Sequence, residues 1–248
     1  MTALVLLSGW GVDARIWSPL TPLWSPATHT SRPDWPGVGR RRKHPMADAG
    51  ALPALAAAMA DDLPSDAVWV GWSLGALYAA ALLEHLPAPR GLIMLGMGPR
   101  FCHPKGVDHQ ALARFRRAFQ RAPDATRDHF LRWQLHGEPS PREALRELRG
   151  WLGDEPPADV DTLARGLDAL ATLDVEKTLS AARCPVVHLC GDSDPLLAPE
   201  VRLAAHERIQ DAGHSPMTSQ PSRLVAAIER HANAMQPASR QRSSEASP

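Results

Sequence analysis

The 248-residue chain lacks three features that would assign it to a special class of protein. Its only cysteines, Cys102, Cys184 and Cys190, are odd in number and irregularly spaced, which predicts no disulfide framework and no zinc site and fits a reducing compartment. The formal net charge is zero, so the overall field favours neither nucleic acid nor an anionic membrane as a partner. No apolar run approaches a membrane span, and the apolar N-terminus has no basic region typical of a signal peptide. We therefore expect a soluble, cytoplasmic protein.

The chain does have apolar, strand-like runs that alternate with helical patterns, and 44% of its residues are hydrophobic. This alternation predicts an α/β fold, with a mostly parallel sheet covered by helices on both faces. The expected strands are residues 3–7, 27–32, 67–70, 91–95 and 185–189. The expected helices are residues 14–23, 52–62, 74–86 and 221–234.

Residues 100–174 break this alternation. They contain no convincing strand and carry several amphipathic helical patterns, interrupted by proline and glycine. A helical segment inserted between strands predicts a cap, or lid. We therefore divide the chain into a core of residues 1–99 and 175–235 and a cap of residues 100–174. The polar tail, 236–248, is expected to be disordered.

A serine between two glycines, Gly71-Trp72-Ser73-Leu74-Gly75, lies at the junction of an expected strand and an expected helix. The pattern G-x-S-x-G alone occurs by chance in about one chain in ten of this length, and a turn that needs only small residues is the alternative explanation. The order of strand, turn and helix favours a nucleophile elbow, in which Ser73 is exposed for attack on a carbonyl.

A serine nucleophile needs a base and an acid that orients the base, and in this kind of fold they follow the serine in the order acid, histidine. Asp194 lies just past the expected strand 185–189, where sites in parallel sheets are built. Asp192 is the competing residue, and a turn or capping role suits it better. His214, in the glycine-flanked loop "DAGHSP", is the histidine in the right order.

Backbone amides are expected to stabilise the negative charge that develops on the substrate oxygen. One donor is the amide of Leu74, directly after the nucleophile, and the other is the amide of Trp10 in the first loop, "SGWGVD". Side chains of Trp10, Trp72, Phe130 and Trp133 are candidates to line a pocket for a medium-length acyl chain.

Four segments of the chain, "LLSGWGVDARIW", "WVGWSLGALYA", "LCGDSDPLLAP" and "AGHSPMTSQP", resemble the pimeloyl-ACP methyl ester esterases of biotin synthesis, members of the α/β-hydrolase superfamily. The resemblance implies an α/β-hydrolase fold and hydrolysis of the methyl ester of pimeloyl-ACP through an acyl-enzyme. It assigns Ser73, Asp194 and His214 as nucleophile, acid and base. It implies no metal and no other cofactor.

The resemblance also implies that basic residues on the cap receive the acidic acyl carrier protein. Residues 100–150 hold eleven Lys and Arg against six Asp and Glu, so this region is basic in a neutral chain. The candidate contacts are Arg114, Arg117, Arg121 and Arg127. The alternative is a solvated helix surface without a partner. The protein is expected to be a monomer.

The chain departs from the family at two points. Ser8 stands where the family usually has histidine, and twenty residues separate Asp194 from His214, fewer than usual, which could misplace the histidine. Two other functions therefore stay open. One is a general carboxylesterase acting on small free esters, and the other is a catalytically silent hydrolase scaffold used for binding.

Overall fold

The computed structural model of the chain describes residues 1–46, 48, 51–153 and 155–235. Six parallel strands form one sheet in the order β2-β1-β3-β4-β5-β6, which confirms the predicted parallel sheet. The strands are β1 (Thr2–Leu7), β2 (Thr28–Ser31), β3 (Val68–Trp72), β4 (Gly91–Leu95), β5 (Val186–Gly191) and β6 (Glu207–Ile209). The sequence did not predict β6, because only Ile209 of its three residues is buried and no apolar run marks it.

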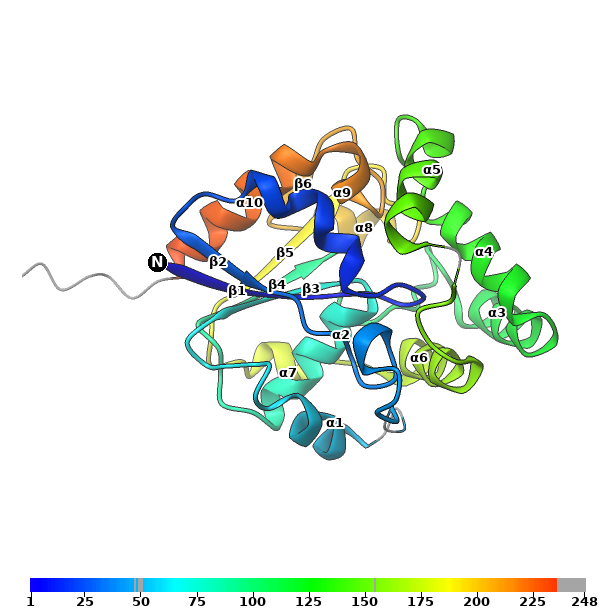
Figure 1. Ribbon diagram of the computed structural model, residues 1–248, viewed down its shortest axis with the longest axis horizontal. Coiled ribbons are helices and arrows are strands. Elements are labelled where there is room, and N and C mark those ends of the chain that lie inside the picture. Colours follow the sequence, from blue (N-terminus) through cyan, green and yellow to red (C-terminus); the bar gives the residue numbers. More distant parts are fainter. Residues whose placement is uncertain (47, 49–50, 154, 236–248) are drawn as a thin grey trace, which may run out of the picture.

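Helices cover both faces of the sheet (Figure 1). Outside residues 100–174 they are η1 (Ala14–Leu23), η2 (Gly39–Arg41), α1 (Leu52–Met59), α2 (Leu74–Ala81), η3 (Leu82–Glu84), α7 (Glu176–Ser180), α8 (Pro199–Leu203), α9 (Pro216–Ser219) and α10 (Pro221–Ala234). The predicted helix 14–23 is a 3-10 helix, because Pro19 and Pro22 inside it lack the N–H that an α-helix would use.

Two hydrophobic clusters lie on opposite faces of the sheet, since successive side chains of a strand point to opposite sides. Val68, Val70 and Trp72 of β3 pack with Trp17 and the apolar side chains of α10, whereas Trp69 packs with those of α1 and α2. The strands are therefore buried on both sides, which explains their nearly continuous apolar sequence.

Residues 100–174, which we continue to call the cap, contain the helices α3 (His109–Arg121), α4 (Pro123–Trp133), α5 (Pro141–Leu152) and α6 (Val160–Thr172). The two ends of this segment lie side by side. The Val175 N–H donates to the Pro99 carbonyl (3.0 Å), and Arg100 pairs with Asp174 (2.9 Å). These helices gather at the end of the molecule toward which the strands run (Figure 1). Within the described ranges, every helix is too short or too polar to cross a membrane.

The predicted division into core and cap units stays a prediction, and the predicted disordered tail, 236–248, lies outside the described residues.

Candidate active site

Ser73 occupies the sharp turn between β3 and α2. Its φ of 56° lies in the left-handed region that residues other than glycine rarely adopt. The Ser73 N–H donates to the Leu95 carbonyl at the end of β4 (2.8 Å), and the Ser73 carbonyl accepts from the Ala76 N–H in the first turn of α2 (2.9 Å). A strained serine held between strand and helix is typical of a nucleophile that must project from the sheet.

The neighbouring glycines allow the backbone to approach this turn closely. A Cβ on Gly75 would lie 2.5 Å from the Ser8 carbonyl oxygen, and a Cβ on Gly9 would lie 2.9 Å from the Cβ of Ser73. Neither position has room for a side chain. The first loop, after β1, is thereby packed directly against the serine.

His214 and Asp194 form a buried pair. Nδ1 of His214 lies 2.8 Å from Oδ2 of Asp194, and both side chains are completely excluded from solvent. The second oxygen of Asp194 accepts the Leu196 N–H (2.9 Å), so both carboxylate oxygens are used. Asp192 instead accepts two long hydrogen bonds from the Asp211 and Ala212 amides. Asp194 is therefore the partner of the histidine, and Asp192 has the turn role expected of it.

The pair lies at the carboxyl end of β4, beside the Ser73 turn. A Cβ on Gly96, next to the Leu95 that bonds Ser73, would lie 3.2 Å from Cε1 and Nδ1 of His214. The other ring nitrogen, Nε2, is buried and has no hydrogen-bond partner in the part of the chain that the structure describes. A base that has not yet met substrate often has a long or absent hydrogen bond to its nucleophile. The short segment between Asp194 and His214 thus still brings the two together.

The expected oxyanion donors are free. The amides of Trp10 and Leu74 form no hydrogen bond with any other described residue. For Leu74 the reason is its place as the first residue of α2, where N–H groups have no acceptor within the helix. Trp10 lies in the loop that Gly9 packs against Ser73.

The Trp10 side chain points into the cap. Its indole N–H donates to the Leu163 carbonyl of α6 (2.8 Å), and its ring meets Phe130 edge-on at 5.0 Å between centroids. Phe130 and Trp133 line a neighbouring apolar cavity of about 170 Å³. Other residues of this cavity are Phe101, Val107, Phe115 and Leu170.

Trp72, also predicted for the acyl pocket, lies elsewhere. Its side chain is on the opposite face of the sheet, because β3 residues alternate and Trp72 shares its face with Val68 and Val70. Its indole N–H donates to the His214 carbonyl (2.8 Å), and the two rings lie 5.3 Å apart. Trp72 therefore supports the histidine loop and does not line the cavity.

The four arginines predicted to contact a carrier protein fall into two groups. Arg114, Arg117 and Arg121 are exposed along one side of α3, and none has an ion pair with any described residue. Arg127, on α4, is only 9% exposed, and its Nε donates to the Gly11 carbonyl (3.0 Å). Burial lowers the pKa of its guanidinium from the ordinary value. The prediction of a surface contact was wrong for Arg127, because its position in α4 faces the core.

Glu138 and Gln134 were not singled out in the sequence. Glu138 is a buried carboxylate that accepts the Ser215 N–H (2.8 Å) and bonds the Ser219 hydroxyl. Gln134 is fully buried, and its side-chain amide has no partner among the described residues. No motif marks either residue.

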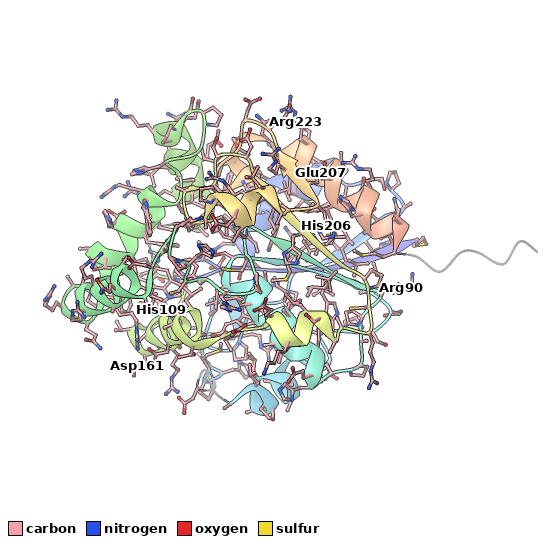
Figure 2. All side chains as sticks on the ribbon, turned by 180° about the vertical axis from the view of Figure 1, so that it is seen from behind. Arg90, His109, Asp161, His206, Glu207 and Arg223 are labelled. Atoms are coloured by element: carbon pink, nitrogen blue, oxygen red, sulfur yellow. The ribbon has the colours of Figure 1, made fainter. Side chains whose placement is uncertain are left out.

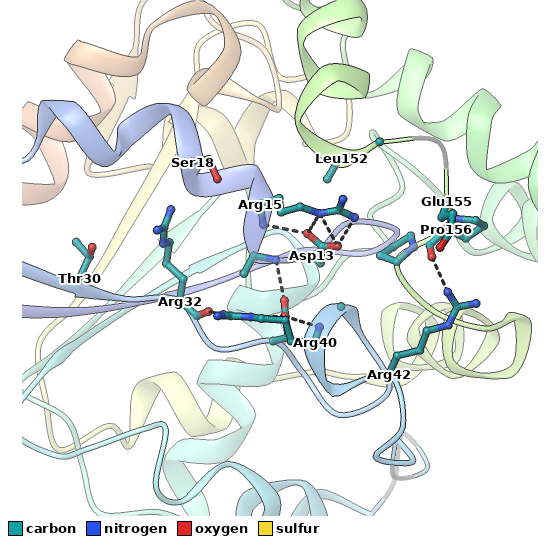
Figure 3. A pocket seen from close by; sticks show the side chains of 15 residues that line it. Asp13, Arg15, Ser18, Thr30, Arg32, Arg40, Arg42, Leu152, Glu155 and Pro156 are labelled. Carbon is teal, nitrogen blue, oxygen red and sulfur yellow. Dashed lines mark hydrogen bonds and ion pairs between the residues drawn. The ribbon is translucent and has the colours of Figure 1, made fainter.

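One group of charged side chains lies away from this site. A large cleft of about 840 Å³ contains Arg15, Arg32, Arg40 and Arg42 with Asp13, Asp34 and Glu155, and none of Ser73, Asp194 and His214 lines it (Figure 3). Its charges largely cancel, since Arg15 pairs with Asp13 and Arg40 with Asp34.

Several further histidines have structural roles. His206 stacks on His188 with 5.8 Å between ring centroids, and Glu207 pairs with His231 and Arg230. His206 and Glu207 lie near β6, away from His109 and Asp161 at the cap (Figure 2). Burial raises the pKa of all three thiols, that of Cys190 to about 12, so none is a ready thiolate at neutral pH.

Comparisons with known proteins identify a family and similar sequences. Residues 4–228 match the model of the Alpha/beta hydrolase family. The chain is 33% identical over 230 residues to the pimeloyl-[acyl-carrier protein] methyl ester esterase of Sodalis glossinidius, a match that covers 88% of each chain. It is 33% identical over 238 residues to the esterase of the same name from Methylococcus capsulatus, covering 91% of this chain and 92% of the other.

Solved structures are similar in fold. A thermophilic esterase from Thermogutta terrifontis is 22% identical, with a TM-score of 0.74 over 96% of this chain and 91% of the other. A hydrolase from Oleispira antarctica is 16% identical, with a TM-score of 0.77 over 94% and 91%. At these identities the likeness concerns the fold alone.

Proposed function

The chain belongs to the alpha/beta hydrolase family, and from this premise we propose that it is a serine esterase that demethylates pimeloyl-ACP methyl ester in biotin synthesis. The observation that carries the proposal is the buried 2.8 Å bond between His214 and Asp194 beside the strained Ser73 turn. The names of the relatives supply the substrate.

In this mechanism Asp194 fixes the tautomer of His214. An ionised carboxylate can only accept hydrogen bonds, so Nδ1 carries the proton and Nε2 is left as the base. Nε2 takes the proton from Ser73 as its oxygen attacks the ester carbonyl. Nε2 then gives this proton to the departing methoxide, and methanol leaves.

The acyl group stays on Ser73 as an ester until water removes it. His214 takes a proton from that water as its oxygen attacks the acyl carbon. The bond from that carbon to the Ser73 oxygen then breaks, the oxygen takes the proton back from His214, and the acid product leaves and ionises to the carboxylate. The Trp10 and Leu74 amides, which no other described group occupies, stabilise the oxyanion in both steps. A preformed donor of this kind contributes about 10²–10³-fold to the rate.

The charges on the exposed surface of the cap favour the proposal that the substrate is bound to a carrier protein. Arg114, Arg117 and Arg121 on α3, together with Arg142 on α5, are exposed and have no carboxylate partner among the described residues. Four unpaired guanidinium groups on one end of a neutral protein favour an acidic partner, such as an acyl carrier protein, by electrostatic steering.

The test is methanol release from pimeloyl-ACP methyl ester compared with free methyl pimelate and with p-nitrophenyl esters. The proposal expects a much larger kcat/KM for the carrier-bound ester, falling steeply as salt is added. Hydrolysis of the small esters but not of the carrier-bound ester would favour a general carboxylesterase. Inactivity on all three would favour the silent binding scaffold.

Reversing the α3 charges tests the docking surface. Arg114→Glu, Arg117→Glu and Arg121→Glu together should raise KM for the carrier-bound ester by about tenfold or more at low salt, because steering is lost. Turnover of p-nitrophenyl butyrate provides the internal standard in the same samples. An unchanged KM for the carrier-bound ester would show that α3 does not receive the carrier.

The cavity beside Trp10 is proposed to hold the acyl chain. Phe130→Ala and Trp133→Ala should each lower the preference for p-nitrophenyl octanoate over the acetate by about tenfold, since each buried methylene is worth about 0.8 kcal/mol. Trp151→Ala on α5, outside this cavity, is the matched control. An unaltered chain-length preference in both variants would place the acyl chain elsewhere.

A further inference from the structure

The cap contacts the catalytic loops through two buried charged side chains. Arg127 extends from α4 to the Gly11 carbonyl, one residue after the proposed oxyanion donor Trp10. Glu138 extends from the turn after α4 to the Ser215 N–H, one residue after His214. Arg127 is 9% exposed and Glu138 4% exposed. One helix and its following turn thus hold both loops that supply the chemistry.

Neither charge is closely paired, although the carboxylates of Asp124, Asp128 and Asp13 lie near enough to Arg127 to favour its charged form. Arg127 and Glu138 form no salt bridge with any described residue, and their side chains bond to backbone groups and to one serine hydroxyl. Burying a charge costs free energy that an apolar side chain of similar size would avoid. The hydrogen bonds of these two side chains to the loops offset this cost.

The Arg127 contact bears on the oxyanion loop. Gly11 has a φ of +76°, and its carbonyl accepts from the guanidinium at 3.0 Å. Glycine backbone is the most mobile of any residue when it is not held. Without this bond the peptide after Gly11 can rotate, and the neighbouring Trp10 amide moves with it.

The Glu138 contact bears on both the acid and the histidine. Gly137, just before it, packs so closely that an added Cβ would lie 2.0 Å from the Ser193 carbonyl oxygen and 3.0 Å from the Cα of Gly213. Ser193 precedes Asp194, and Gly213 precedes His214. The turn after α4 therefore rests on both loops of the pair, and the Glu138 carboxylate fixes it there.

We propose that Arg127 and Glu138 are positioning residues through which the cap holds the oxyanion loop and the histidine loop in their reactive arrangement. This inference rests on the proposed serine mechanism and goes beyond it, since it makes kcat depend on where the cap sits. The cap surface proposed to bind the carrier protein would then be linked to the catalytic loops through Arg127 and Glu138.

The test uses p-nitrophenyl butyrate, which needs no carrier protein. Arg127→Met and Glu138→Leu remove the hydrogen bonds, and Arg127→Lys and Glu138→Gln keep one donor or acceptor at each site. The matched controls are Arg132→Met on α4 and Glu143→Gln on α5, both exposed. Each kcat is divided by the concentration of reactive serine, which is the amount of protein labelled when the fluorophosphonate reaction is complete. Unfolded protein is then not counted as enzyme.

Arg127→Met and Glu138→Leu should each lower kcat by about tenfold to a hundredfold, as expected for a misplacement of about 1 Å. KM should stay within about threefold, and the lysine and glutamine variants should recover only part of the loss. A purely structural role would lower the melting temperature and leave kcat per reactive serine equal to that of the controls. That second result overturns the proposal.

If the methionine or leucine variant does not fold, the conservative variants decide. Lysine is shorter and donates from a single ammonium group, so Arg127→Lys should still lose about threefold or more in kcat. Equality with wild type overturns the proposal. Failure of the proposed function gives a different result. In that case the wild-type protein does not hydrolyse the ester, or Ser73→Ala is as active as the wild type.

Discussion

Replacing Ser73 by alanine is expected to lower kcat for every ester by about a millionfold, the loss found when a nucleophile that acts with its base as one unit is removed. The reason lies in the turn itself. Ser73 sits at φ 56°, its N–H donates to the Leu95 carbonyl, and the glycines beside it have no room for side chains that would displace the turn. Alanine keeps this backbone but offers no oxygen to form the acyl-enzyme.

The matched control is Ser8→Ala. Ser8 is also buried, and lies on the adjacent loop, but its hydroxyl has no partner among the described residues. Removal of an unpaired hydroxyl should change kcat by less than about threefold. Both proteins are assayed by initial rates on p-nitrophenyl butyrate. Residual activity of more than about one per cent in Ser73→Ala would show that another group is the nucleophile.

Asp194→Asn is expected to lower kcat by about 10⁴-fold with little change in KM. Oδ2 of Asp194 now holds the proton on Nδ1 of His214, 2.8 Å away, in a site without solvent. An asparagine can present its NH₂ group to Nδ1, which favours the tautomer with the proton on Nε2. In that tautomer His214 has no lone pair to receive the serine proton.

Asp192→Asn is the comparison for this variant, since Asp192 lies two residues away and its carboxylate accepts from the Asp211 and Ala212 amides, each at 3.4 Å. We expect a loss of less than about tenfold, because long hydrogen bonds of this kind are weak. Stopped-flow rates on p-nitrophenyl butyrate measure both variants. Similar losses in the two would mean that the acid has not been correctly identified.

The sequence predicted the parallel sheet because its strands are buried on both faces and read as continuous apolar runs. It also predicted that Asp194 and His214 meet, because Asp194 follows β5 at the edge of the sheet where strand ends converge. The pairing of Asp194 with His214 needs only that order and a loop that can close, and a short helix, α8, with a short strand, β6, is sufficient.

Other features depend on which way a side chain faces, and the sequence leaves this open. Arg127 reads like its exposed neighbours on the cap, yet its turn of α4 points to Gly11. Trp72 reads like a pocket residue, yet the alternation of β3 sends it to the far face. Glu138 lies in an unremarkable turn, and only the packing of that turn on Ser193 and Gly213 gives it a role. Long-range contacts of this kind have no local signature.

The central claim is that Ser73 is the nucleophile of an esterase that binds a carrier-linked ester. The most direct test is the mass of the peptide containing Ser73 after reaction with a fluorophosphonate, with and without pimeloyl-ACP methyl ester as competitor. The account predicts one adduct on Ser73, none on that peptide in Ser73→Ala, and slower labelling when the carrier-bound ester is present. Labelling of another residue, or no labelling of the folded protein, would contradict it.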